Sequence, residues 1–415
     1  MSIKRSLLAA LTLGAALTLT AAVPAEAQFG KLKDKVKKKV EQRVDQKTDE
    51  AAEAAVDAAD PTTGGAAAPS AAPAAAAADG AAGTPVAASP DAKPGEGVWA
   101  NYDFVPGERV LFTEDFTRDN VGDFPRRLEF AEGNMEVVEW KGERWLRGTT
   151  DGKFYIALPE VLPERFTVEF EHAGQSWSYP QLMVRFDGHD EDERANHRVQ
   201  IMTWHGSSSR SGGGILAADG SQVSVGASEL LHDVPFTVRI MADGKYVKVY
   251  MNSIRVANVP NADLGRANRI VVEFDGNDEH PAFFRNFRIA AGGRKLYDAL
   301  AAEGRVATQG IYFDTGSDRL RPESSPTLKE IATMLKEHAD LRLAIEGHTD
   351  NVGQAAANQT LSEARAAAVR KHLVESYGVD AARLESKGLG ATKPVGSNDT
   401  PEGRQSNRRV ELVKL

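Results

Sequence analysis

Apolar and polar residues alternate with a period of two between Trp99 and Ala291. DG, ADG and GGG turns separate the eight segments that show this alternation, which are FTVEFEHA, QLMVRFDG, HRVQIMTW, FTVRIMAD, YVKVYMN, RVANV, RIVVEFDG and FFRNFRIA. A two-residue period places successive side chains on opposite faces of a strand, so one face of each strand is expected to be buried. We therefore predict that residues 97–292 form an all-β domain of two packed antiparallel sheets.

Helical spacing of apolar residues appears in the last part of the chain. One helix is predicted to open at Ser325-Pro326, and a second to begin at a capping box of Thr360 and Glu363 and to end at Gly378. Their buried positions are predicted to be Leu328, Ile331 and Leu335 in the first helix and Ala366, Val369, Leu373 and Tyr377 in the second. Strands are predicted in the segments IYFDTGSDRL, LRLAIEGHTD, ARLESKGLG and RRVELVKL. The order β-α-β-α-β-β predicts an α/β sandwich over residues 305–415, after a short connector at 293–304 that favours contact between the two domains.

Three different segments precede the β-domain. Residues 1–27 combine a basic start, an apolar run and an Ala-Glu-Ala ending, which predicts a secretory signal peptide cleaved after Ala27. Residues 28–60 have apolar residues at intervals of four among many lysines, which predicts a basic amphipathic helix. This helix is either a solvated spacer or a contact with a membrane surface or a partner helix. Residues 61–96 are rich in Ala, Pro and Gly and are predicted to be a disordered linker.

Charge and composition narrow the range of functions. The 415 residues carry a formal net charge of −9, which argues against nucleic acid as a partner because nucleic-acid-binding proteins usually present a basic face. The length favours two or three domains. The sequence contains no cysteine, so it has neither a disulfide nor a lipidated cysteine of the kind that anchors bacterial lipoproteins.

The stretch GHTDNVGQAAANQTLSEARAAAV brings an acid, Asp350, near a base, Arg365. The two residues could form a catalytic pair, a metal site with His348, a structural salt bridge, or a clamp for a ligand that carries both charges. A metal site would have only two protein ligands here, and no nucleophile with its base and orienting group accompanies the pair. Because a guanidinium binds a carboxylate through two parallel hydrogen bonds, a zwitterionic amino-acid head group suits one fixed charge of each sign.

Several motifs of the last 110 residues occur together in one known family. The segments FDTGSDRL, IEGHTDNVG, NQTLSEARAAAV, RLESKGLGATKPVGSN and GRQSNRRVEL resemble the OmpA-like peptidoglycan-binding domain over residues 305–415. The resemblance implies that the ligand is the diaminopimelate of the peptidoglycan stem peptide, that Asp350 accepts from its ammonium and that Arg365 binds its carboxylate. It further implies contacts, by motif position, from Asp314, Phe313, Thr349, Asn358, Leu361 and Arg408. No cofactor or metal is implied.

The β-domain has a weaker resemblance, carried by ADGKYVKVYMNSIRVANV and the closing FFRNFRIA. These segments resemble concanavalin-A-like and laminin-G jelly rolls, which implies a glycan or protein ligand. A glycan hydrolase needs two carboxylates across a cleft. One pair of acids in a predicted strand, Glu169 and Glu171, lacks a third acid and is expected to face solvent. The strands are also shorter and more charged than those of a transmembrane barrel.

Two further clusters in this domain have residue types that occur in binding sites. The acidic stretch from His189 to His197 could supply calcium ligands, but it fits no calcium-binding loop and is interpreted as a solvated loop. Three residues, Trp177, Trp204 and His205, could line a sugar platform or pack in the core.

These observations together predict a secreted, non-enzymatic protein of the periplasm, associated with the cell wall and outer membrane. It would bind peptidoglycan through its C-terminal domain and hold the β-domain at the cell wall. One alternative is a carbohydrate-active enzyme, a glycan hydrolase, with a wall-targeting C-terminal domain. Another is an adhesin or assembly partner that binds a protein through the β-domain.

Overall fold

The computed structural model describes eight segments of the chain. They are residues 93–99, 102–174, 181–186, 198–202, 211–216, 222–227, 234–292 and 296–415. No helix in these segments has the length and apolar content to cross a membrane. The described residues do not include the predicted signal peptide and amphipathic helix, the predicted linker up to residue 92, the acidic loop at 189–197, or Trp177, Trp204 and His205. The last linker residues, 93–96, are described and form a turn in which the N–H of Glu96 donates to the carbonyl of Lys93.

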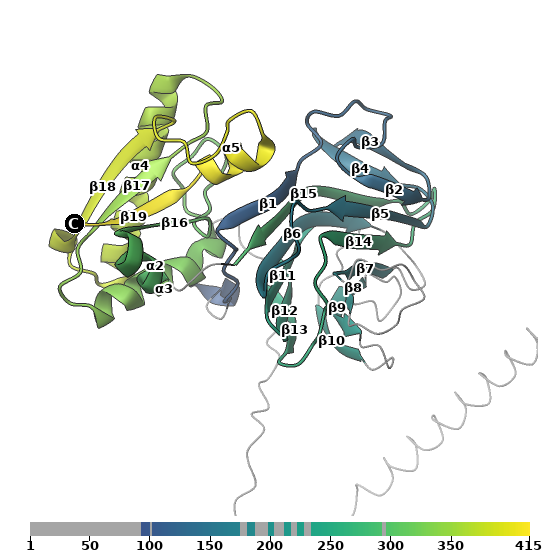
Figure 1. The fold of residues 1–415 in the computed structure, drawn as a ribbon, viewed down its shortest axis with the longest axis horizontal. Coiled ribbons are helices and arrows are strands. Elements are labelled where there is room, and N and C mark those ends of the chain that lie inside the picture. Colours follow the sequence, from purple (N-terminus) through teal and green to yellow (C-terminus); the bar gives the residue numbers. More distant parts are fainter. Residues whose placement is uncertain are drawn as a thin grey trace, which may run out of the picture. The chain divides into compact units, whose positions relative to one another are not determined.

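An eight-stranded sheet forms one half of the β-domain (Figure 1). Its hydrogen-bonded order is β13-β12-β11-β6-β15-β4-β3, with β1 paired to β15, and all of its ladders are antiparallel. The strands are β1 (Arg109–Glu114), β3 (Met135–Trp140), β4 (Glu143–Gly148), β6 (Arg165–Gly174), β11 (Phe236–Asp243), β12 (Tyr246–Met251), β13 (Ile254–Val259) and β15 (Ala282–Ala291). A short 3-10 turn at Gly97–Trp99 precedes them.

A seven-stranded antiparallel sheet forms the other half. Its order is β10-β9-β8-β7-β14-β5-β2. The strands are β2 (Glu129–Glu132), β5 (Gly152–Ala157), β7 (Gln181–Arg185), β8 (Arg198–Met202), β9 (Ser211–Leu216), β10 (Gln222–Ala227) and β14 (Arg269–Phe274). The two sheets make the described part of 97–292 a domain rich in β-structure, as the two-residue period predicts; we refer to it below as the sandwich.

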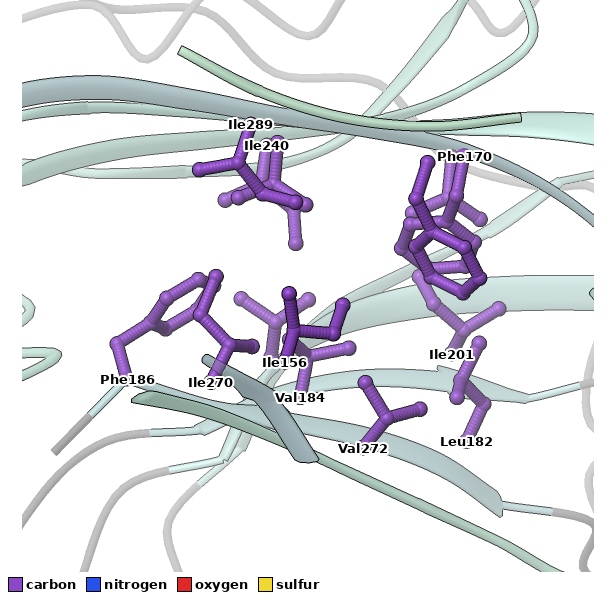
Figure 2. Packing of buried hydrophobic residues seen from close by; sticks show 14 of the residues in the cluster. Ile156, Phe170, Leu182, Val184, Phe186, Ile201, Ile240, Ile270, Val272 and Ile289 are labelled. Atoms are coloured by element: carbon purple, nitrogen blue, oxygen red, sulfur yellow. The ribbon is translucent and has the colours of Figure 1, made fainter. Parts of the chain in front are cut away.

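The core of the sandwich lies between the two sheets. Figure 2 shows Phe170, Ile240 and Ile289 of the eight-stranded sheet facing Ile270 and Val272 of the other sheet. All five side chains are buried. Burying large aliphatic and aromatic side chains from both sheets in one cluster is the main force that holds such a domain together.

All eight strand segments that the alternation predicts are strands. The pattern misses β1 to β5, β9 and β10. The expectation that Glu169 faces solvent is wrong, because its side chain is buried. In the eight-stranded sheet Glu169 lies directly between Arg239 of β11 and Arg288 of β15, and it forms ion pairs with both. A carboxylate between two cross-strand arginines can be buried because its charge is compensated.

The C-terminal domain has a four-stranded sheet and three longer helices. The sheet order is β16-β19-β17-β18, in which only the β17–β18 ladder is parallel. The strands are β16 (Arg305–Thr308), β17 (Leu343–His348), β18 (Leu384–Gly390) and β19 (Val410–Lys414). The helices are α2 (Leu296–Glu303), α3 (Ser325–Glu337), α4 (Ala355–Tyr377) and the short α5 (Pro401–Asn407), with 3-10 turns at Pro322–Ser324 and Ala381–Arg383.

Several local predictions for this domain need correction. Helix α4 begins at Ala355, so Thr360 is not an N-cap; its hydroxyl donates to the carbonyl of Ala356 inside the helix. An alanine-rich start needs no capping box to be helical. The segment IYFDTGSDRL is not a strand beyond one bridge between Phe313 and Leu320, and β16 precedes it. The end of α4 at the left-handed Gly378 is as predicted.

Helices α2 and α5 are absent from the predicted order. Helix α2 occupies the stretch interpreted as a connector, and its Leu296, Ala299 and Leu300 belong to the core of the C-terminal domain. Helix α5 begins at Pro401, and its N-cap is Thr400, whose hydroxyl accepts from the N–H of Gly403. The buried positions predicted for α3 and α4 are correct, except that Tyr377 is only partly buried.

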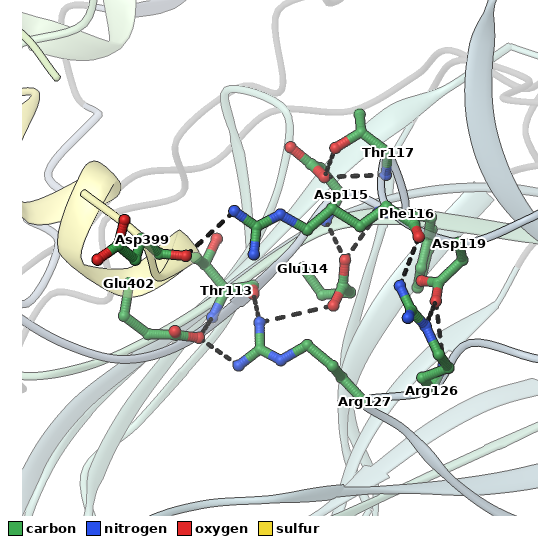
Figure 3. Close-up of polar contacts among 11 residues, drawn as sticks. Thr113, Glu114, Asp115, Phe116, Thr117, Asp119, Arg126, Arg127, Asp399 and Glu402 are labelled. Atoms are coloured by element: carbon green, nitrogen blue, oxygen red, sulfur yellow. Dashed lines mark hydrogen bonds and ion pairs between the residues drawn. The ribbon is translucent and has the colours of Figure 1, made fainter. Parts of the chain in front are cut away.

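The sandwich and the C-terminal domain contact each other at two places. At the first, Glu402 of α5 accepts hydrogen bonds from the N–H of Thr113 (3.0 Å) and from Arg127 (2.5 Å) (Figure 3). At the second, the Tyr312 hydroxyl donates to Glu169 at 3.1 Å, and Arg239 lies 3.7 Å from Glu323. The contact that the short connector favours is therefore present.

Candidate ligand-binding site

The loop after β17 presents Asp350. The N–H of His348 donates to the carbonyl of Arg409, and the N–H of Thr349 donates to the carbonyl of Gly390, so both neighbouring strands fix the end of β17. Asp350 is buried, and its Oδ1 accepts from the N–H of Val352 at 3.1 Å. The carboxylate is thus held in one orientation at the carboxyl end of a central strand.

Arg408 is the cation that pairs with Asp350. Its Nη1 donates to Asp350 Oδ2 at 2.6 Å, and the Asp350 side chain is 10% exposed against 45% for Arg408. Arg408 follows the last residue of α5 and also donates to Gln405. Among the described residues no ion pair joins Asp350 to Arg365, which disfavours the hypothesis of a structural salt bridge between those two. A carboxylate has about four acceptor positions, so Asp350 can bind a further donor.

Arg365 projects from α4 toward the loop 313–317. Since α4 begins at Ala355, Arg365 is about three turns into the helix. Its Nε donates to the carbonyl of Ser317 at 2.9 Å, its Nη2 donates to the carbonyl of Asp314 at 3.3 Å, and its guanidinium lies 4.9 Å from the centre of the Phe313 ring. Only carbonyls accept from it in the hydrogen bonds described.

Burial and the nearby charge of Arg408 lower the pKa of Arg365 from its ordinary value. The guanidinium nevertheless stays protonated at neutral pH, because arginine titrates far above that range. A half-buried cation with neutral partners is electrostatically under-compensated, and a ligand carboxylate would stabilise it.

Asn358 and Asp314 have supporting contacts. Asn358 Nδ2 donates to the carbonyls of Asp350 (3.2 Å) and Val352 (3.0 Å), which fixes the loop that carries the acid. The Asp314 carboxylate instead pairs with Arg319 at 2.6 Å. Asp314 therefore contributes its backbone carbonyl to the position of Arg365, and its charge is already compensated.

Seven of the eight residues that the family resemblance selects line one cleft of about 1000 Å³. They are Phe313, Thr349, Asp350, Asn358, Leu361, Arg365 and Arg408, whereas Asp314 is not among the lining residues. The motifs do not select the other lining residues, which are chiefly Tyr312, Asn398, Arg404, Gln405 and Arg409 of the C-terminal domain and Asp115, Thr117 and Arg118 of the sandwich. The arginines beside Arg408 were visible in the motif GRQSNRRVEL, but the sandwich residues had no local signal.

The described lining of the cleft has an excess of positive charge. It includes five arginines (118, 365, 404, 408 and 409) and two aspartates (115 and 350). Arg404 donates to the carbonyl of Asn398 at 2.9 Å, and Arg118 donates to the carbonyl of Asp399 at 3.2 Å. Guanidinium groups whose partners are carbonyls keep their net charge, so the cleft favours anionic groups.

Three titratable residues, Glu346, His348 and Glu411, place ligand atoms within 4.8 Å of one another, and His348 also lines the cleft. Arg409 donates to Glu411 at 2.8 Å and Arg305 does so at 3.0 Å. The His348 ring and the Arg409 guanidinium lower the pKa of Glu411 to about 2, against burial, which raises it. Because two arginines already neutralise Glu411, we interpret this cluster as a structural ion-pair group. Asp350 is not part of it.

Comparison with known proteins agrees with the motifs. The OmpA family matches residues 312–408. These residues form an OmpA family domain. Outer membrane porin F of Pseudomonas aeruginosa is 39% identical over 137 residues, which is 33% of this chain and 38% of that protein. Peptidoglycan-binding protein ArfA of Mycobacterium bovis is 40% identical over 116 residues, which is 28% of this chain and 35% of that protein.

Among solved structures, the peptidoglycan-associated lipoprotein from Burkholderia pseudomallei is 31% identical, with a TM-score of 0.25; the match covers 29% of this chain and all of that one. The chain spans little more than a third of the length of the two curated relatives. The similarity to relatives thus concerns the OmpA domain, which contains all eight residues selected by the resemblance.

Proposed function

We propose that this protein binds cell-wall peptidoglycan non-covalently through the cleft of its OmpA domain. The main observation is that Asp350 and Arg365 line one cleft without pairing with each other. The relatives support binding to peptidoglycan, since one is named a peptidoglycan-binding protein and another a peptidoglycan-associated lipoprotein. Their names describe porin, binding and wall-associated proteins rather than enzymes, so we assign no reaction to the chain.

The ligand group we propose is the free amino-acid head of diaminopimelate in the stem peptide. Its ammonium would bind Asp350, and its carboxylate would bind Arg365 through charge-assisted hydrogen bonds. Asn358 and Arg408 would fix the acid, Thr349 would support the loop, and Phe313 and Leu361 would pack against the aliphatic part of the ligand. Asp314 would act through its backbone carbonyl, which accepts from Arg365.

The proposed cellular role follows from this binding. A leader that ends at Ala27 would export the chain to the periplasm, and the OmpA domain would anchor it to the wall near the outer membrane, where the name of the similar porin places that relative. The sandwich, for which we retain the jelly-roll assignment, would be the module that is anchored there. Its two antiparallel sheets around one core support that assignment.

Co-sedimentation with purified sacculi tests the proposed function. Wild-type protein should pellet with sacculi that contain diaminopimelate, and Asp350→Asn and Arg365→Gln should each weaken binding by at least about tenfold, because each removes a charge-assisted contact. Arg342→Gln is the matched control, since Arg342 is an exposed arginine of the same domain that does not line the cleft.

A competition experiment tests the head group itself. Free diaminopimelate should release the protein from sacculi, whereas Nα-acetyl-lysine amide should not, because it has a side-chain ammonium without an adjacent carboxylate. Equal pelleting of wild type and both cleft variants would reject the proposed function.

A further inference from the structure

The proposed ligand cleft is built from two domains. Three of its lining residues, Asp115, Thr117 and Arg118, belong to the sandwich and follow β1 directly. The remaining lining residues belong to the OmpA domain and the loop before it. A ligand larger than one amino-acid head group would therefore meet a surface of the sandwich.

The segment 115–118 has a conformation fixed by its own residues. Glu114 Oε1 accepts from the N–H groups of Asp115 (3.0 Å) and Phe116 (2.9 Å), and Asp115 Oδ1 accepts from the N–H and hydroxyl of Thr117 (Figure 3). Phe116 has a φ of 59° and is fully buried in the sandwich core. A bulky residue keeps a left-handed conformation only where its surroundings impose it.

The same segment is attached to the OmpA domain on both sides of its turn. Before it, the N–H of Thr113 donates to Glu402, which also accepts from the guanidinium of Arg127. After it, Arg118 Nη2 donates to the carbonyl of Asp399. This hydrogen bond from the Arg118 side chain to a backbone carbonyl fixes Arg118 beside the loop that also carries Asn398, another lining residue.

The charge of Arg118 is uncompensated in the described part of the chain. No carboxylate there forms an ion pair with Arg118, and the carbonyl of Asp399 is the one acceptor described for its five N–H donors. The neighbouring Asp115 carboxylate instead accepts from Thr117. A guanidinium in this state, at the wall of a cleft, offers a planar pair of donors to an anionic group of the ligand.

We propose that Arg118 binds a second carboxylate of the peptide whose amino-acid head group lies between Asp350 and Arg365. This inference rests on the proposed function and adds to it: the sandwich takes part in selecting the ligand, which is an acidic peptide rather than an isolated amino acid. In a stem peptide the free α-carboxylate of the γ-linked glutamate, next to diaminopimelate, is the group of the required chemistry.

Calorimetric titration of the full chain with three probes tests this assignment. The probes are free diaminopimelate, the tripeptide L-alanyl-γ-D-glutamyl-diaminopimelate, and the same tripeptide with its glutamate α-carboxylate converted to the amide. Wild type should bind the acidic tripeptide about tenfold more tightly than the amidated one, a typical effect of one charge-assisted hydrogen bond. Arg118→Gln should abolish this difference and leave binding of diaminopimelate and of the amidated tripeptide unchanged.

Two variants separate this inference from the proposed function. Arg365→Gln should weaken the binding of all three probes. Arg266→Gln changes an exposed sandwich arginine outside the cleft and should leave the binding of all three unchanged. If wild type binds none of the probes, the proposed function and the inference both fail. If wild type binds and Arg365→Gln weakens binding, but Arg118→Gln leaves the preference for the acidic tripeptide intact, only the role of Arg118 is rejected. An equal loss for all probes in Arg118→Gln would likewise reject it, because it would show a general effect on the cleft.

Discussion

Arg127 of the sandwich donates a hydrogen bond to Glu402 of the OmpA domain at 2.5 Å, across 275 residues of sequence. Arg127 also donates to the carbonyl of Thr113 (2.6 Å), and its guanidinium lies 4.7 Å from the centre of the Phe112 ring. Both side chains of the pair are partly exposed, at 35% and 23%. The pair therefore attaches α5 to β1 at a site that is neither fully exposed to solvent nor fully buried.

Glu402→Ala should weaken the attachment between the domains. It removes the acceptor of both Arg127 and the Thr113 N–H, so we expect the free energy of unfolding to fall by about 1–3 kcal/mol. Differential scanning calorimetry should show a lower and broader transition. Glu385→Ala is the control, because Glu385 is 63% exposed and pairs loosely with Arg342, and it should change stability by less than about 0.5 kcal/mol. Equal melting curves for the two variants would contradict the role of Glu402.

Glu169→Gln should be the more damaging change at the second interdomain contact. The carboxylate is buried and accepts from Arg239, Arg288 and Tyr312, so a neutral side chain leaves buried arginines without their main counter-charge. We expect a loss of about 3–5 kcal/mol in urea unfolding.

Tyr312→Phe is a milder change at the same contact and serves as the control for Glu169→Gln. It removes one hydrogen bond to Glu169 and leaves the ion pairs, so it should cost only about 1 kcal/mol. Losses of the same size in both variants would argue that the arginines are compensated by other groups, such as Glu323 beside Arg239.

The stability of the sandwich should depend on pH through His172. This side chain stacks on Phe284 and its Nδ1 lies 3.0 Å from the carbonyl of Phe283; burial lowers the pKa of His172 to about 4. The unfolded chain, in which histidine titrates near its ordinary value of 6.5, binds the proton more tightly than the folded chain. Stability should therefore fall as the pH decreases from about 6.5 to 4, by about 3 kcal/mol in total.

His172→Gln provides the comparison for this pH dependence. Glutamine does not titrate, so urea midpoints measured between pH 7 and pH 4 should fall less steeply in the variant than in wild type. Parallel profiles would assign the acid sensitivity to other groups.

Gly347→Ala should distort the strand that leads to Asp350. A Cβ at residue 347 would lie 2.3 Å from the carbonyl oxygen of Ser362 in α4, so the helix would have to move off the sheet. We expect a loss of about 1–3 kcal/mol in thermal or urea unfolding, together with weaker diaminopimelate binding. Gly304→Ala is the control: its φ of 71° strains alanine, but nothing lies within 4 Å of the added carbon, so it should spare binding. Unchanged binding and stability in Gly347→Ala would contradict this close packing.

Local patterns identify much of the fold and most of the cleft. Alternation identifies the strands β6, β7, β8 and β11 to β15, because each has apolar residues at enough alternate positions to mark its buried face. It misses β9, whose sequence SGGGIL has little side-chain pattern. The capping box at Thr360 was wrong because the alanines before it continue the helix, and no sequence rule decides between two adequate start sites.

Contacts between distant segments could not be predicted in the same way. Glu169 reads as a solvent-facing acid because its two arginine partners lie on strands 70 and 119 residues away. Arg408 was assigned to the ligand by motif, yet its ion pair with Asp350 depends on how α5 packs beside the loop after β17. Sequence spacing carries no information about such pairings, since they are set by sheet order and domain docking.

The sequence by itself determined the β-rich and OmpA-like organisation, the acid and base at Asp350 and Arg365, and five further residues that line the cleft. These features are local, because periodicity and motif spacing act over a few residues. Only the tertiary structure decided that Asp350 pairs with Arg408 and that Arg118 of the sandwich reaches the wall of the same cleft. Those arrangements arise from the packing of the sandwich against α5, where burial and hydrogen bonds between remote segments select one docking geometry.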